Sequence, residues 1–427
     1  SDKNDRNGVL VTEENGGNLN FSAHQLTSYK NSVCGVSLEE HGSGDIDSVL
    51  HAFDASANGG TDDNDYDGYG LQIVEWNHGS LDLEIYDPTI EKIKSAEGIY
   101  LQENHAGDID ATLREFNINK IDDDDGIEID EHGPGNLTVD ASGMNMSKLV
   151  DGIDLWETHG GNLAFRGDRI TFDNCDEAIE IEEDGSGNLI AEISNTRINN
   201  AYEGFEIEED DSGDISVKLN NVIVDQTEDE GLEIEEYKGG DLYLEVHNSQ
   251  FLNSRGEGID VEENDNGNLT AKLFNVVTSA KEEGVDLRES NAGDLLVESW
   301  MLRTSGGGIG ISLTEDSKGD LKASLSETTV TGASDDGLYV YEDHNGNLEL
   351  KVVTMDLTNC GGDAISASEN GKGDFSAEFT SGRLQADKYG LSLEEHGGGQ
   401  GVARAFGVDL EGDLDDYWVE NVELIIS

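Results

Sequence analysis

Apolar residues recur along this chain as alternating pairs, and each pair follows a small residue. The small residues, taken as anchors, are Gly8, Gly35, Gly70, Gly98, Gly126, Gly152, Ala178, Gly204, Gly231, Gly258, Gly284, Gly310, Gly337, Ala364 and Gly390. These fifteen anchors are mostly 26 to 28 residues apart, with one interval of 35. The residues one and three positions after each anchor are apolar, as at Ile179 and Ile181. Alternation with a period of two predicts a β-strand in every copy.

Two further positions of the repeat hold the same residue in all fifteen copies. Five residues after the anchor stands a glutamate, and nine residues after it stands a glycine, which Asp or Asn follows in thirteen copies. Because a tight turn with positive φ favours glycine, we expect a turn there. A second strand such as Leu189–Ile193 and a third short one such as Val222–Val224 complete the repeat. The expected structural positions include Glu131, Glu157, Glu183, Glu209, Glu236, Glu263, Gly187, Gly213 and Gly240.

One such coil cannot bury its own inner face, but stacked coils form a continuous core. Leucine-rich repeats and propeller blades have other periods and do not fit. The pattern therefore predicts an all-β parallel β-solenoid (parallel β-helix) of about fifteen coils, with three short strands per coil. We expect a single domain over residues 1–427, with coils at 7–410 and a capping or docking segment at 411–427.

The repeat architecture resembles the right-handed parallel β-helix superfamily, the pectate-lyase-like fold, over nearly the whole chain. Many members of that superfamily cleave acidic polysaccharides, so the resemblance implies a polysaccharide lyase or hydrolase as one alternative. The arginines of this chain are scattered, and no lyase or polygalacturonase motif is recognisable. The regular coils also lack the long loops that usually build such active sites. We therefore expect no enzyme.

The charge of the chain limits its partners. It has 94 Asp and Glu against 25 Lys and Arg, for a net charge of −69. Such a surface repels nucleic acid and anionic lipid and favours cations or basic partners, although solubility or adaptation to salt is a simpler explanation. Disorder is disfavoured, because the 35% of apolar residues follow a regular schedule. No apolar run is long enough for a membrane span.

Acidic side chains also form a column two residues after the anchor in seven consecutive copies. They are Glu128, Asp154, Glu180, Glu206, Glu233, Asp260 and Asp286. In a solenoid, equivalent positions stack about 4.8 Å apart, so bare neighbours repel by roughly 1 kcal/mol even in water. We expect these acids to point outward and to bind Ca²⁺ diffusely or at several sites; a solvated charged face is the alternative.

The invariant glutamates call for a different interpretation, because every copy has one. Alternation continued into the turn places them inward, where their carboxylates can accept hydrogen bonds from backbone N–H groups of the following turn. A structural role is expected. Metal ligation is the alternative, since buried lone pairs need partners.

The most local metal signal lies in the long interval. Asp63, Asp65 and Asp67 alternate before a glycine, as in the first half of an EF-hand-type calcium loop. The twelfth position of that loop is Val74, and Glu75 follows one residue late. The sequence thus predicts a partial calcium site here, with an acidic surface loop as the alternative.

Taken together, these features predict a secreted or cell-surface acidic structural protein that binds cations and self-assembles end to end. The chain starts at Ser1 rather than Met, which is compatible with the removal of an export signal. Assembly is expected through Val9 and Val11 of the first coil and through Trp418, Leu424 and Ile426 of the tail, because solenoid ends are open sheet edges. The alternative is a monomeric acidic adhesin for a basic protein, polymer or mineral.

Overall fold

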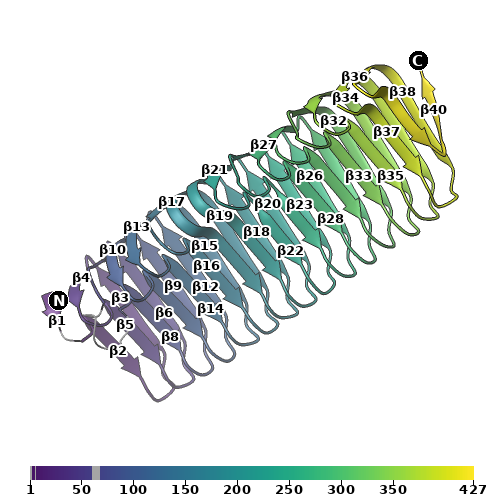
Figure 1. Ribbon diagram of the computed structural model, residues 1–427. Helices are drawn as coiled ribbons and strands as arrows, with labels where there is room; N and C mark the ends of the chain where they lie inside the picture. Colours follow the sequence, from purple (N-terminus) through teal and green to yellow (C-terminus); the bar gives the residue numbers. More distant parts are fainter. Residues whose placement is uncertain (1, 5, 60–67) are drawn as a thin grey trace. The chain divides into compact units, whose positions relative to one another are not determined.

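The computed structural model describes residues 2–4, 6–59 and 68–427, and every regular element in this part of the chain is a β-strand. Residue contacts divide the chain into two compact units, Ser1–Gly213 (unit 1) and Asp214–Ser427 (unit 2). Each unit is a parallel β-solenoid in which successive coils stack on one another (Figure 1). Together they contain about 15 coils, which confirms the predicted fold class. The single domain expected from the sequence stays a prediction.

Each coil contributes to three faces. In unit 1 the first face contains β2 (Val9–Glu13), β5 (Val36–Glu40), β8 (Leu71–Glu75), β11 (Ile99–Glu103), β14 (Ile127–Glu131), β16 (Ile153–Glu157) and the ends of β17 (Leu163–Glu183) and β19 (Arg197–Glu209). The second contains β3 (Leu19–His24), β6 (Ile46–His51), β9 (Leu81–Tyr86), β12 (Ile109–Arg114), the starts of β15 (Leu137–Ser147) and β17, and β18 (Leu189–Ser194). The third contains β1 (Asp2–Asn4), β4 (Thr27–Asn31), β7 (Asp54–Ser56), β10 (Thr89–Lys94), β13 (Asn117–Asp122) and later parts of β15, β17 and β19.

Unit 2 repeats this arrangement. Its first face contains β22 (Glu233–Glu236), β25 (Asp260–Glu263), β28 (Val285–Glu289), β31 (Ile311–Glu315), β33 (Leu338–Glu342), β35 (Ile365–Glu369), β37 (Tyr389–Glu395) and β39 (Asp415–Glu420). The second contains β20 (Ile215–Asn220), β23 (Leu242–His247), β26 (Leu269–Phe274), β29 (Leu295–Trp300), the starts of β32 (Leu321–Thr331), β34 (Leu348–Cys360), β36 (Phe375–Ala386) and β38 (Gly401–Gly412), and β40 (Val422–Ile426). The third contains β21 (Ile223–Thr227), β24 (Gln250–Leu252), β27 (Val277–Ala280), β30 (Arg303–Gly306) and the ends of β32, β34, β36 and β38.

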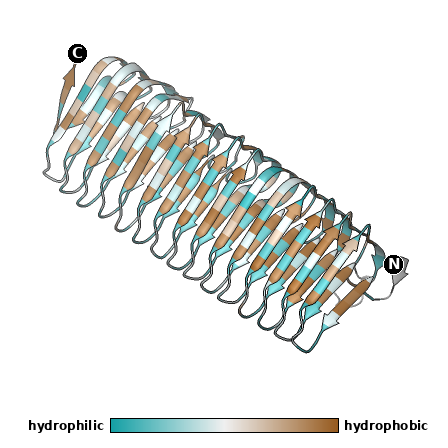
Figure 2. Ribbon diagram, turned by 180° about the vertical axis from the view of Figure 1, so that it is seen from behind, coloured by the Kyte–Doolittle hydropathy of each residue, from teal (hydrophilic) through white to brown (hydrophobic). Residues whose placement is uncertain are grey.

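The core of each unit lies inside the coils. Apolar residues of the alternating pairs stack in register, as Ile127 does on Ile153 and Ile129 on Leu155, and all four are buried. Figure 2 shows the alternation as bands of apolar and polar positions along the strands. Burial on this scale, at roughly 25 cal/mol per Å² of apolar surface, is the main stabilising contribution. The sequence prediction of inward apolar pairs is confirmed.

The fixed glycines occur for a different reason from the one expected. Gly187 and Gly213 do not adopt positive φ. Instead, a Cβ at Gly187 would lie 1.4 Å from the Gly161 carbonyl oxygen, and a Cβ at Gly213 would lie 1.5 Å from that of Gly187. In unit 2 the carbonyl oxygen of Gly240 stands 1.6 Å from the place of a Cβ at Gly267. The turn prediction therefore holds, but its explanation by positive φ is wrong. The turns stack too closely for any side chain.

The Asp or Asn that follows each fixed glycine ties neighbouring coils together. In unit 2 the Asn268 amide donates to Asp241 Oδ1 at 2.7 Å, and Asn268 Oδ1 accepts the backbone N–H of Asp294 at 3.0 Å. Asp294 Oδ1 then accepts the N–H of Asp320 at 2.9 Å. A side-chain carbonyl oxygen at this position thus satisfies one backbone donor of the next coil, which explains the preference for Asp and Asn.

Positive φ occurs at the corner between the second and third faces. Asn195, Asn221, Asn248 and Asn275 have φ between 51° and 57°. Asn tolerates this left-handed conformation better than most residues. The Asn275 amide also donates to Asn248 Oδ1 at 3.0 Å, so the two side chains form a ladder in unit 2.

The residues expected to mediate assembly lie at the outermost coils of their units. Val9 and Val11 are half-buried, whereas Val36 and Leu38, which pair with them in the next coil, are buried. The segment 411–427 forms β39 and β40, which continue the first and second faces of unit 2 by pairing with β37 and β38. Trp418 and Ile426 are exposed, at 45% and 48%, and Leu424 is half-buried.

Candidate functional site: the acidic columns

The acidic column predicted from the sequence lies on the first face of each unit. In unit 1 Glu128, Asp154, Glu180 and Glu206 pair in register on successive strands, and in unit 2 Glu233, Asp260 and Asp286 do so. Each points away from the apolar core between two buried neighbours, but all seven side chains are half-buried rather than fully exposed. Stacking on the next coil covers each carboxylate in part. The acids are therefore less solvated than the sequence suggested.

A second acidic column, which the sequence reasoning missed, runs beside the first. It consists of the residue immediately before the anchor: Glu97, Asp125, Asp151, Glu177 and Glu203 in unit 1, and Glu230, Glu257 and Glu283 in unit 2. The signal was present, because this position is Asp or Glu in eight consecutive copies. The sequence reasoning missed it because the column lies before the anchor, outside the alternation that follows it; six of its eight residues lie in loops, and Glu177 and Glu203 lie within β17 and β19.

The two columns lie on either side of the anchor glycines. In unit 2 one carboxylate oxygen from each of Glu257, Glu282 and Glu283 lies within 4.8 Å of the others, and Glu282 immediately precedes the second-column residue Glu283. Asp260 and Asp286 follow on β25 and β28, and one carboxylate oxygen of each, Oδ1, is buried without a hydrogen-bond partner among the described residues. These five residues are called the unit 2 acidic cluster below. The anchor between the columns must be small, because a Cβ at Gly258 would lie 2.6 Å from the Gly284 carbonyl oxygen.

Burial first, and repulsion between like charges second, raise the pKa values of this cluster. Burial, followed by the charges of Asp286, Glu262, Glu257 and Glu233, raises the pKa of Asp260 to about 9. Burial also raises the pKa of Asp286, although Arg288 and a hydrogen bond from Ser312 oppose the shift. The pKa values of Glu257 and Glu283 rise to about 7, again mainly through burial. A bound cation would favour the ionised form of every one of these groups.

Unit 1 has a comparable grouping. One carboxylate oxygen from each of Glu177, Glu203 and Glu206 lies within 4.8 Å of the others. Burial and the charges of Asp154 and Asp151 raise the pKa of Glu180 to about 10. Here the second column also forms hydrogen bonds with the backbone, because Asp151 Oδ1 accepts the N–H of Glu177 at 3.0 Å.

The invariant glutamates form a third column, which faces the interior of the turn. Glu131, Glu157, Glu183, Glu209, Glu236 and Glu263 are all buried. Glu183 Oε1 accepts the N–H groups of Gly185 and Gly187 at 3.1 and 3.2 Å, and the other five accept turn N–H groups in the same way. These are the hydrogen bonds that the sequence led us to expect, and the structural role of the glutamates stays a prediction. We call this set, with its equivalents in other coils, the buried glutamate column.

The structure describes only part of the calcium loop predicted in the 35-residue interval between anchors. Asp63, Asp65 and Asp67 lie outside the described residues. Glu75, which the sequence associates with them, belongs to the buried glutamate column, and both of its carboxylate oxygens accept the N–H of Asn77, at 3.0 and 2.9 Å. Its part in a calcium loop stays a prediction.

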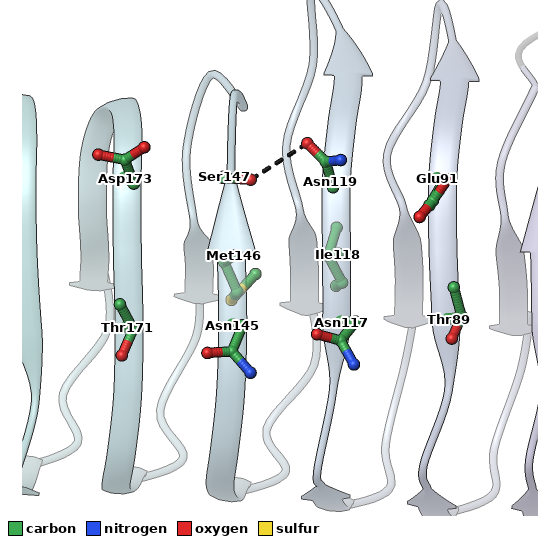
Figure 3. Close-up of a pocket in the computed structure, with 10 residues that line it drawn as sticks. All are labelled: Thr89, Glu91, Asn117, Ile118, Asn119, Asn145, Met146, Ser147, Thr171 and Asp173. Atoms are coloured by element: carbon green, nitrogen blue, oxygen red, sulfur yellow. Dashed lines mark hydrogen bonds between the residues drawn. The ribbon is translucent and has the colours of Figure 1, made fainter.

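A polar groove of about 540 Å³ lies on the third face of unit 1, across β10, β13, β15 and β17 (Figure 3). One row of side chains contains Thr89, Asn117, Asn145 and Thr171, and a second row contains Glu91, Asn119, Ser147 and Asp173. The two acids of the groove, Glu91 and Asp173, are three coils apart, or roughly 14 Å. Paired glycosidase carboxylates stand about 5–9.5 Å apart, so these two do not form such a pair.

Comparison with protein-family models, curated protein sequences and solved structures finds no match for this chain. The resemblance to the right-handed parallel β-helix superfamily therefore stays a prediction. No helix in the described part of the chain could cross a membrane.

Proposed function

We propose that this protein is a secreted or cell-surface structural protein that binds calcium ions through its two acidic columns. The observation that carries this proposal is the unit 2 acidic cluster. One carboxylate oxygen from each of Glu257, Glu282 and Glu283 lies within 4.8 Å of the others, and Asp260 and Asp286 of the same two coils each have one buried oxygen without a hydrogen-bond partner among the described residues. Ca²⁺ takes six to eight oxygen ligands at about 2.3–2.6 Å, and carboxylates that repel one another supply both the ligands and the driving force. Ca²⁺ fits better than Mg²⁺, which demands a regular octahedron and keeps most of its waters.

The chemistry of the cluster favours cations over other ligands. Bare carboxylates 4.8 Å apart repel by roughly 1 kcal/mol at the dielectric constant of water, and by more where burial excludes water. Burial, and then the charges of neighbouring acids, raises the pKa of Asp260, and burial raises that of Asp286. A divalent cation relieves several repulsive pairs at once. This distinguishes a site from a surface that is merely solvated.

The test is a calcium titration by isothermal calorimetry at fixed ionic strength. The D260N/D286N variant removes the two acids whose oxygens lack partners. The control variant E298Q/E349Q removes the same formal charge from two exposed positions on β29 and β34 of unit 2. We expect saturable binding in the wild type and the control, with fewer sites or at least tenfold weaker binding in D260N/D286N. Equal isotherms for the two variants would show that calcium is only a diffuse counterion.

We also propose end-to-end assembly, supported by the exposed apolar residues of the outermost coils. Leu10 is 55% exposed on β2, and Ile425 and Ile426 are exposed on β40. In the described chain, β2 and β40 each pair on one side only. Unpaired edges with apolar side chains favour strand addition. Light scattering in EDTA and then with calcium should show particles larger than one chain; a monomer throughout would contradict assembly and leave cation binding untouched.

A further inference from the structure

The buried glutamate column has features that its hydrogen bonds to the turn do not explain. They are clearest in unit 2 at Glu315, Glu342 and Glu369, which end β31, β33 and β35 and stack in register. All three side chains are 0% exposed. This part of the column lies several coils beyond the unit 2 acidic cluster, at coils where Ser312, Tyr339 and Ser366 replace the outward acids.

One oxygen of each carboxyl group is occupied by the turn. Glu315 Oε1 accepts the N–H of Ser317 at 3.1 Å, and Glu342 Oε1 accepts that of Gly346 at 2.7 Å. Glu369 Oε1 accepts the N–H groups of Gly371 and Gly373 at 2.8 and 3.1 Å. In these three coils the turn therefore holds its glutamate by Oε1 alone.

The second oxygen of each group, Oε2, is buried and accepts no hydrogen bond from the described residues. A buried carboxylate oxygen without a donor is strongly unfavourable, because it has lost its water. No lysine or arginine in the described chain forms an ion pair with these three residues. The carboxyl groups of Glu315 and Glu369 lie beside that of Glu342. Asp316 adds a further negative charge beside Glu315.

The occupant that this arrangement accommodates is a proton. A carboxyl group that holds a proton becomes a donor and can satisfy its neighbour's free oxygen, whereas two adjacent carboxylates cannot. A calcium ion would need six to eight oxygens. Each gap offers only the free oxygens of two glutamates, and the turn uses their other oxygens. Burial raises the pKa of Glu342 to about 8 and that of Glu315 to about 7, in the same direction.

We propose that the buried glutamate column is a proton-binding ladder, in which carboxyl groups of successive coils share protons at neutral pH. The inference goes beyond calcium binding and concerns a different set of residues. It also means that the folded protein carries less negative charge than its formal −69.

The ladder couples folding to proton binding with a definite sign. In the unfolded chain Glu315 and Glu342 titrate near their ordinary pKa of about 4.3. Between that value and the raised values of the folded state, the folded protein binds more protons than the unfolded chain. The free energy of unfolding therefore falls as pH rises through this window. One shared proton changes the unfolding equilibrium constant by up to about tenfold per pH unit.

The test compares E342Q with E349Q. Gln at position 342 keeps the shape, lets its carbonyl oxygen accept the Gly346 N–H and lets its amide donate to a neighbouring carboxylate, without a titrating proton. E349Q removes the same formal charge from an exposed position of β34 in the same coil. Two measurements are made on the full chain in EDTA: infrared spectra at neutral pH, and urea unfolding between pH 5 and 8.

We expect the spectrum of the wild type minus that of E342Q to show the carbonyl band of a protonated carboxylic acid. The corresponding E349Q difference should show only a carboxylate band. The unfolding equilibrium constant should rise less steeply with pH in E342Q than in the wild type. The two slopes should differ by up to about a factor of ten per pH unit. A carboxylate band for E342Q, or an unchanged slope, would overturn the proposal. So would a bound metal, found by elemental analysis in the wild type and lost in E342Q. If E342Q does not fold, E315Q provides the same comparison in the adjacent coil.

Discussion

The stacked turns lead to a sharp prediction about Gly187. A Cβ at this position would lie 1.4 Å from the Gly161 carbonyl oxygen, against an ordinary contact of about 3.3–3.6 Å. The two turns would therefore have to separate by roughly 2 Å. Gly187→Ala tests whether the fold tolerates that separation.

The hydrogen bonds between the two coils that such a separation would break set the magnitude. They include Asp184 N–H to Glu157 O at 2.7 Å, Asn188 N–H to Asn162 Oδ1 at 3.1 Å and Leu163 N–H to Asn188 O at 3.0 Å. At about 0.5–1.5 kcal/mol each, their loss destabilises the protein by about 2–5 kcal/mol. For a unit of this size, 1 kcal/mol lowers the midpoint of thermal unfolding by roughly 2–4 °C.

The preceding turn supplies the control. A Cβ at Gly160 would lie 3.4 Å from Ser186 Oγ, which is an ordinary contact, and Gly160 does not have positive φ. Thermal unfolding followed by circular dichroism should show a large decrease in the midpoint for G187A and little change for G160A. Gly187→Asn separates the two explanations, since Asn tolerates positive φ but not the contact, and we expect it to be as damaging as Ala. Equal midpoints for G187A and G160A would refute the steric argument.

Three other predictions concern the buried glutamate column, the Asp or Asn position after the fixed glycine, and the first acidic column. The free energy of unfolding at low salt in EDTA should be greater at pH 5.5 than at pH 9. Burial raises the pKa values of Glu131 and Glu183 to about 10 and about 9, and groups with raised pKa values lose their contribution to stability as pH rises through those values. Urea unfolding at the two pH values measures this, and greater stability at pH 9 would contradict it. Asn268→Ala should cost about 1–2 kcal/mol, because it removes the bonds to Asp241 and to the Asp294 N–H; an unchanged urea midpoint would count against the role of this position. The E180Q/E206Q variant should be at least as stable as the wild type in EDTA, since it removes like charges from one column, but it should gain less stability on addition of calcium; a collapse in EDTA would mean that these acids are structural.

Much of the fold could be predicted from the sequence, because a solenoid repeats one local pattern of strands and turns about fifteen times. The alternation of Ile127 and Ile129 with Glu128 is visible in any coil, and it predicts which side chains face the core. The invariant glutamate was also correctly placed inward, because the strand alternation extends to it. Such local patterns need no knowledge of distant contacts.

The features that were missed depend on how closely coils approach one another. Position 187 requires glycine because its backbone contacts the carbonyl oxygen of Gly161 in the neighbouring coil, and only the stacked structure reveals this contact. Glu257 and Glu283 lie in loops, where no periodic alternation marks the side of the sheet that a residue occupies. The half-burial of Asp260 likewise arises from the neighbouring coil, and it is what turns a row of acids into a candidate binding site.

The most direct test of calcium binding is a crystal structure of the protein grown with calcium, with the ions located by anomalous scattering. We predict an ion among Glu257, Asp260, Glu282, Glu283 and Asp286, with carboxylate oxygens at about 2.3–2.6 Å. A cluster without an ion in crystals grown at saturating calcium, or ions scattered over the exposed acids alone, would contradict the proposed function.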